Sequence, residues 1–285
     1  MSTIPADPSF RRILVALDAS RESRAALAAA AGFADRLEAE ITGVFIEDID
    51  LLNLAALPFS REIPALSMSG RVLDPDKVEH ALLSTAAAAR RALAAVAETH
   101  HLRWTFRVVR GHVETELLTA SQDADLVAVG KGTRPLSGDA RLGRAGRVVA
   151  SQTARSVLFA ATGQGSMHAP MAIIYDASSP SAAALDFVTR LAEANRRPLV
   201  IFVLSQTPAA FAQQEALLRE RLRDSGISGS IRQASIFDPV SLLYTLQSET
   251  FSLLVVGGAV LPLLPGVTLD SLIAKCQCSV LLLRR

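Results

Sequence analysis

Short apolar runs alternate with longer amphipathic segments along the chain. In the first half these runs are ILVALD (13–18), EITGVFI (40–46), WTFRVVRG (104–111), DLVAVG (125–130) and SVLFA (156–160). Runs of this length, bounded by turn residues, are typical of strands buried on both faces. The segments between them place apolar residues at helical spacing, most clearly at 77–99, and Ser20 is positioned to cap an alanine-rich helix through Leu37. Strands that alternate with helices predict parallel βαβ units with right-handed crossovers.

The two halves of the chain repeat one unit. ILVALDASRESRAAL (13–27) aligns with MAIIYDASSPSAAAL (171–185) without a gap when Asp18 is placed on Asp176. The closing runs also match, since ADLVAVG parallels SLLVVGG and RSVLFA parallels CSVLLL. We therefore predict an α/β protein with two tandem doubly wound, Rossmann-like domains, each built on a five-stranded parallel sheet. We expect the first domain at 1–161 and the second at 169–285. The Gly-rich stretch TGQGSMHAP (162–170) is the expected linker.

The second copy is shorter, and most of the difference falls at 47–76 of the first copy. This stretch has no clear period, so we expect a long loop or an irregular excursion. Long loops often serve as binding lids or contact surfaces, and disorder is the plain alternative.

Charge and composition narrow the class of partner. The chain has 29 Lys and Arg against 28 Asp and Glu, a net charge of +1. This balance gives no electrostatic reason to expect a nucleic acid. A low net charge makes self-association easier to tolerate, which leaves a homo-oligomer open.

The remaining signals indicate a cytoplasmic protein outside the membrane. The start, MSTIPADPSFRR, has no apolar core of a signal peptide. The charge-free stretch 251–269 is interrupted by glycines and prolines, so we expect a strand and a loop there rather than a membrane span. Two cysteines fit a reducing compartment, and the five histidines fall in no metal-ligand spacing.

The pieces ILVALDAS, RVVRGHVETELL, DLVAVGKG and SVLFA, taken together with the repeat, resemble the universal stress protein family. The resemblance covers nearly the whole chain, once per half. It implies a five-stranded parallel sheet, pairing through the last strand and, in many members, ATP at the point where the strand order reverses. Tandem members resemble a dimer joined in one chain, so we expect the two halves to form an intramolecular pseudo-dimer through SVLFA and SVLLL.

The family's nucleotide motif is Gly, two residues, Gly, nine residues, Gly, and then Ser or Thr. Gly130 takes its first position, Thr133 stands at the second with Gly132 beside it, Gly143 takes the third, and Arg144 replaces the hydroxyl residue. Glycines let backbone N–H groups approach phosphates. Two interpretations stay open: the arginines of this loop hold the phosphates in place of the hydroxyl, or a solvated basic loop covers a site that has lost its ligand.

The resemblance also implies roles at the ends of the early strands. Asp18 matches the acidic residue that contacts the nucleoside, and Ile46 falls where an apolar residue packs on adenine. Val129, beside Gly130, completes the expected site. The alternatives are an Asx turn for Asp18 and ordinary core packing for Ile46.

The second half keeps Asp176 and Gly257 but has a shorter, apolar loop, so we expect a degenerate copy there. The sequence thus favours a stress-response or regulatory protein that binds ATP or another adenine nucleotide in its first domain. No nucleophile elbow, Walker loop or carboxylate pair predicts an enzyme. A slow ATP hydrolase or nucleotidyl transferase on the same fold, or an interaction protein that binds no nucleotide, remain the alternatives.

Overall fold

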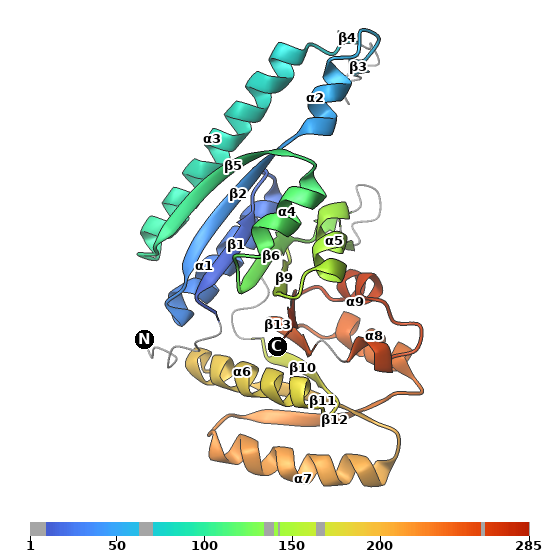
Figure 1. Ribbon diagram of the computed structural model, residues 1–285. Helices are drawn as coiled ribbons and strands as arrows, with labels where there is room; N and C mark the ends of the chain where they lie inside the picture. Colours follow the sequence, from blue (N-terminus) through green and yellow to red (C-terminus); the bar gives the residue numbers. More distant parts are fainter. Residues whose placement is uncertain are drawn as a thin grey trace.

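A computed structural model describes residues 10–62, 71–133, 140–141, 143–163, 169–257 and 260–284. Its centre is one ten-stranded sheet in the order β12-β11-β10-β13-β14-β9-β6-β1-β2-β5 (Figure 1). Each half contributes five strands that are parallel to one another. The two tandem doubly wound units predicted from the sequence are therefore confirmed.

Strand and helix alternate through the first half. Its sheet strands are β1 (Arg12–Ala16), β2 (Glu40–Asp48), β5 (Trp104–Gly111), β6 (Leu126–Gly130) and β9 (Ser156–Ala160). The helices that cover them are α1 (Arg21–Leu37), α3 (Pro75–Thr99), α4 (Val113–Ser121) and α5 (Arg144–Gln152). Ser20 caps α1 by accepting a hydrogen bond from the Ser23 backbone N–H, as its sequence position predicted.

The second half repeats this order. Its strands are β10 (Met171–Tyr175), β11 (Leu199–Ser205), β12 (Gly229–Ser235), β13 (Leu253–Gly257) and β14 (Ser279–Leu283). Its helices are α6 (Ser179–Asn195), α7 (Pro208–Asp224), α8 (Pro239–Ser248) and α9 (Leu269–Lys275), with a short 3₁₀ turn at Leu261–Leu263. Ser178 caps α6 as Ser20 caps α1. Among the described residues, no helix is long and apolar enough to cross a membrane.

The closing strands of the two halves lie side by side and run antiparallel. In β9 and β14, Val157 is opposite Leu282, and Phe159 is opposite Val280. All four side chains are buried. The Arg284 guanidinium, just after β14, donates to the carbonyls of Ala150 and Thr153 at the end of α5. The sheet and its hydrophobic core are therefore continuous across the junction.

The region 47–76 departs from the expected irregular loop. It contains the end of β2, the helix α2 (Ile49–Ala55) and a small hairpin of β3 (Arg61–Glu62) and β4 (Arg71–Val72); residues 63–70 lie outside the described part. Asp48 caps α2 through the Asp50 backbone N–H. A helix of seven residues spans about two turns, too few to show a period in the sequence.

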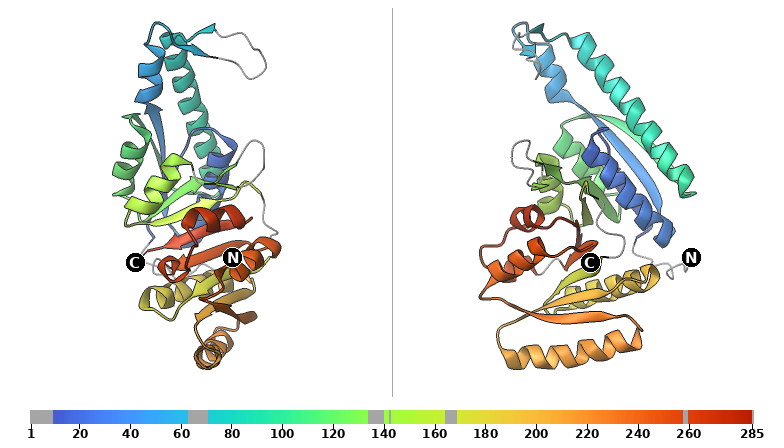
Figure 2. Two further views of the ribbon diagram at one scale, coloured as in Figure 1. Left: turned by 90° about the vertical axis from the view of Figure 1, so that its right-hand side faces the viewer. Right: turned by 180° about the vertical axis from the view of Figure 1, so that it is seen from behind.

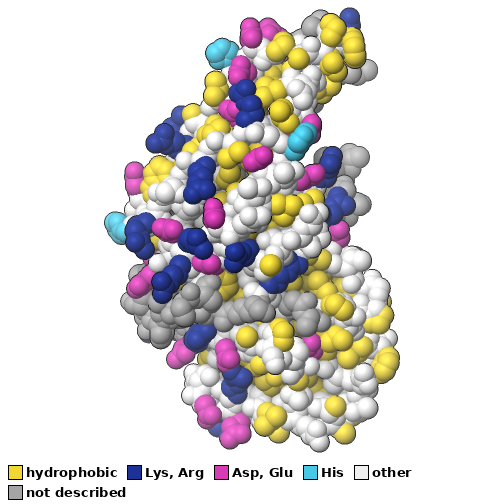
Figure 3. Space-filling view, in the orientation of Figure 1, with side chains coloured by type: hydrophobic (Ala, Val, Ile, Leu, Met, Phe, Trp, Pro, Cys, Tyr) yellow, Lys and Arg dark blue, Asp and Glu magenta, His cyan; other side chains and the backbone are white. Residues whose placement is uncertain are grey.

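This region forms an arm with the upper part of α3, and the arm projects beyond the sheet in both views of Figure 2. Hydrophobic side chains gather at its tip in Figure 3. Those of Leu51, Leu54, Leu57 and Phe59 are exposed. The arm therefore presents exposed apolar side chains on a segment that has no counterpart in the shorter second copy.

Candidate functional site

A cavity of about 640 Å³ opens at the carboxyl edge of the first half's sheet. The ends of β1, β2 and β6 form its floor, and the starts of α1, α4 and α5 surround it. Six of the eight residues predicted as a site line it: Asp18, Ile46, Val129, Gly130, Gly132 and Gly143. Open α/β sheets bind ligands at this edge, where the strand order reverses between β1 and β6.

Asp18 follows β1 at the mouth of this cavity. Its Oδ1 accepts a hydrogen bond from the Ser20 backbone N–H at 2.9 Å, so the Asx turn considered as an alternative role is present. Burial raises the pKa of the Asp18 carboxyl, but hydrogen bonds from Ser20 and Ser23 outweigh it and hold the pKa below its ordinary value. Asp18 therefore places a carboxylate at the rim at neutral pH.

Gly130 has a packing role that sequence reasoning did not identify. A Cβ atom at this position would lie 2.5 Å from the backbone carbonyl of Glu22, in the first turn of α1. Glycine is thus required for α1 to lie against the end of β6. At Gly257, the corresponding position of the second half, the nearest contact would be 3.4 Å.

Gly143 is the N-cap of α5 and faces open space. No described atom would lie within 4 Å of a Cβ there, and no described side chain caps the helix. Ala145 and Gly146, in the first turn of α5, line the cavity beside it. The first N–H groups of a helix lack intrahelical partners and carry the positive end of the helix dipole. This turn can therefore donate to an anion in the cavity.

Arg144 is not among the described residues that line this cavity. The Arg144 Nε lies 2.7 Å from Glu114 Oε1 in the first turn of α4, and the Arg144 side chain is 85% exposed. Two short strands, β7 (Gly132–Thr133) and β8 (Ala140–Arg141), form an antiparallel hairpin in which Thr133 is opposite Ala140. The side chain of Thr133 lies outside the described part. The structure therefore brings Arg144 to a carboxylate of its own chain.

Lys131 is the residue of this loop that sequence reasoning missed. It stands between Gly130 and Gly132 and is only 2% exposed. Its Nζ donates to the backbone carbonyls of Ile273, Cys276 and Cys278 in the second half, at 3.4, 3.2 and 2.5 Å. Burial lowers the pKa of this lysine, and the two cysteine thiols partly oppose the change.

The hairpin of β7 and β8 also packs on α9. The second half therefore holds the loop that borders the cavity. A charged residue between two glycines at a strand end was visible in the sequence, but its partners lie more than 140 positions away.

The second half differs at the matching edge of its sheet. Asp176 accepts hydrogen bonds from both the backbone N–H and the hydroxyl of Ser178 through Oδ1. Val260, Leu264 and Val267, from the apolar loop after β13, are buried in the core. Their burial explains why this loop is apolar in the second half.

Comparison with known proteins agrees with this architecture. A universal stress protein from Archaeoglobus fulgidus is 16% identical over 96% of this chain and 98% of its own, with a TM-score of 0.71. A candidate universal stress protein from Pseudomonas aeruginosa is 14% identical over 96% and 93%, with a TM-score of 0.64. These similarities concern the fold. No curated protein matches the chain.

The family comparison concerns the first half. The model of the universal stress protein family matches residues 9–160, which contain β1 through β9 and every residue of the candidate site. This match covers more than half of the 285 residues. The chain therefore belongs to the universal stress protein family.

Proposed function

We propose that this chain is a stress-response or regulatory module whose first half binds an adenine nucleotide, with ATP the first candidate. The observation that carries the proposal is one cavity that joins a carboxylate at Asp18, apolar walls at Ile46 and Val129, and the open first turn of α5. Its volume of about 640 Å³ lies in the range of small-molecule sites, about 300–1,000 Å³.

Each part of the cavity suits a different part of a nucleotide. Ile46 and Val129 offer apolar surface for the base, and the Asp18 carboxylate can accept hydrogen bonds from ribose hydroxyls. The N–H groups at the start of α5 suit the phosphates. At Gly143 no described atom would lie within 4 Å of a Cβ, so the described residues leave that approach open.

The lining favours binding over turnover. Among the described residues that line the cavity there is no histidine, lysine or cysteine. Asp18, with a lowered pKa, is a poor general base because its conjugate acid is too strong near neutral pH. We therefore propose a binding protein rather than an ATP hydrolase or nucleotidyl transferase.

The test is isothermal titration of the full chain with ATP, AMP and cyclic AMP. The repeat supplies a matched control, since Asp18→Asn alters the proposed site and Asp176→Asn alters the corresponding carboxylate of the second half. A charge-assisted hydrogen bond contributes about 1.5–3 kcal/mol, so Asp18→Asn should weaken ATP roughly ten- to a hundredfold. Asp176→Asn should leave ATP affinity unchanged.

Two outcomes decide between the alternatives. Absence of binding below millimolar concentration for all three nucleotides would exclude the nucleotide proposal and favour an interaction protein. Incubation of the complex with ATP, followed by chromatography of the nucleotides, should return ATP unchanged. Steady formation of ADP or AMP, lost in Asp18→Asn, would instead favour the enzyme.

A further inference from the structure

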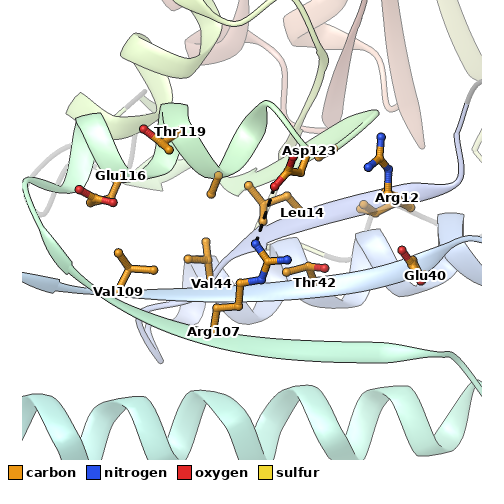
Figure 4. Close-up of a pocket in the computed structure, with 13 residues that line it drawn as sticks. Arg12, Leu14, Glu40, Thr42, Val44, Arg107, Val109, Glu116, Thr119 and Asp123 are labelled. Carbon is orange, nitrogen blue, oxygen red and sulfur yellow. Dashed lines mark ion pairs between the residues drawn. The ribbon is translucent and has the colours of Figure 1, made fainter.

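A second cavity, of about 380 Å³, lies between α4 and the sheet of the first half, toward the start of β1 and β2 (Figure 4). Its floor is apolar, with Leu14, Val44 and Ala124 all buried. Arg107 extends across this floor from β5, and its guanidinium lies 3.8 Å from the carboxylate of Asp123, in the turn after α4 (Figure 4). Nothing in the proposed nucleotide site requires this space.

The repeat shows what fills the same place in the second half. Strand register pairs Val44 with Ala16 in the first half and Phe202 with Ile174 in the second, so Val44 corresponds to Phe202. By the same registers, Arg107 corresponds to Arg232.

The residue before β6 has a counterpart too. The Asp125 backbone N–H donates to the Arg12 carbonyl, and the Ser252 N–H donates to the Pro170 carbonyl. Pro170 corresponds to Arg12 in the repeat alignment. Ala124, one position earlier, therefore corresponds to Phe251.

In the second half two phenylalanines occupy the space. Phe202 and Phe251 are buried and pack edge to face, with ring centroids 6.0 Å apart and an interplanar angle of 82°. The Arg232 guanidinium lies 5.9 Å from the centroid of the Phe202 ring, at cation–π distance. The Arg232 Nη1 lies 2.6 Å from Glu249 Oε1, and this ion pair fixes the guanidinium.

The first half keeps the arginine, which pairs with Asp123 one position along from the counterpart of Glu249, but loses both rings. Val44 and Ala124 stand where the second half has phenylalanines, so side-chain volume is lost at both positions. Leu14, which is larger than its counterpart Ala172, fills only part of the lost volume. The cavity is what remains. An apolar cavity of about 150 Å³ is enough to hold benzene, so this one has room for a ring.

We propose that this cavity binds a small aromatic molecule whose ring takes the place of the missing phenylalanines and stacks beneath the Arg107 guanidinium. Both signs of charge surround it: Arg12 and Arg107 against Glu40, Glu116 and Asp123. This mixed rim favours a ligand without net charge over an aromatic anion or cation. The site is separate from the proposed nucleotide cavity, although Val44 borders both.

The test uses the full chain and ligand-observed NMR with indole and phenol as probes. Cyclohexanol controls for apolarity without aromaticity, and benzoate and benzylamine control for charge. Indole and phenol should bind, cyclohexanol should bind at least tenfold more weakly than phenol, and the charged compounds should bind more weakly than phenol. Equal binding of cyclohexanol and phenol would overturn the aromatic assignment.

Variants locate the site. Ala124→Phe restores a ring found in the second half without touching Val44, and should abolish probe binding and raise the melting temperature. Ala124→Leu fills less space and replaces it as the test if the larger side chain prevents folding. Arg107→Gln should weaken indole, whereas the matched change Arg232→Gln should not. Absence of indole and phenol binding in the parent chain, or binding unaffected by filling at Ala124, would refute the proposal.

Discussion

Lys131 offers the sharpest test of how the two halves cooperate. The change to examine is Lys131→Met, which keeps an unbranched side chain that ends at the Cε position and removes the ammonium with its three N–H donors. The carbonyls of Ile273, Cys276 and Cys278 would lose this donor at the end of α9. Each buried acceptor left without a partner costs about 1–3 kcal/mol. Removing a buried ammonium from its costly environment offsets part of that loss.

We therefore expect Lys131→Met to lower the free energy of unfolding by about 2–4 kcal/mol. Urea denaturation followed by circular dichroism measures this. The matched control is Lys275→Met, because Lys275 lies in the last turn of α9, close to the same carbonyls, but is exposed. It should change stability by less than about 0.5 kcal/mol. A Lys131→Met variant as stable as the parent would refute the assigned role of these hydrogen bonds.

The same residue gives a dependence on pH with a defined sign. Burial lowers the folded-state pKa of Lys131 from its ordinary value of 10.5. Between the folded pKa and 10.5 the unfolded chain binds more protons, so the free energy of unfolding rises with pH across that window. The thiols of Cys276 and Cys278 face the same group, and the hydrogen bond between them raises the pKa of Cys276 and lowers the pKa of Cys278. We therefore subtract the pH dependence of the free energy of unfolding of Lys131→Met from that of the parent. The difference should rise with pH, because the variant lacks the titrating ammonium.

Three further predictions concern the loop, the cavity and the junction. Gly130→Ala should destabilise the chain by about 1–3 kcal/mol in a thermal melt, because its Cβ meets the Glu22 backbone at 2.5 Å, and Gly257→Ala should cost less. Arg144→Ala should change ATP affinity by less than about threefold in a titration, because Arg144 is exposed and pairs with Glu114, an ion pair that contributes about 0–1 kcal/mol. A tenfold loss of affinity for ATP but not for adenosine would instead assign Arg144 to the phosphates. Residues 1–163 expressed alone should dimerise or aggregate in sedimentation, because β9 loses β14; a monomer at high concentration would contradict this.

Much of the fold followed from local patterns. Apolar runs ended by turn residues predicted the five sheet strands of the first half and, through the repeat, β10, β13 and β14 of the second, whereas β11 and β12 were not predicted individually. Helix α2 was missed because its seven residues show no period and because its cap, Asp48, sits at the end of an unusually long strand. Local patterns therefore predicted long elements better than short ones.

The candidate site was predicted in part. Asp18 and Gly130 could be placed because the carboxyl ends of neighbouring parallel strands share an edge. The structure added that Gly130 is required for helix packing and that Arg144 pairs with Glu114. The contacts of Lys131 could not be inferred, since hydrogen bonds to carbonyls far along the chain leave no periodic signal.

The most direct test of the proposed function is a crystal structure of the full chain grown with ATP. The account predicts electron density for the nucleotide in the first half only, with the base against Ile46, the ribose at Asp18 and the phosphates at the first turn of α5. Density at the carboxyl edge of the second half, beside Asp176, or none in the first half at saturating ATP, would contradict it.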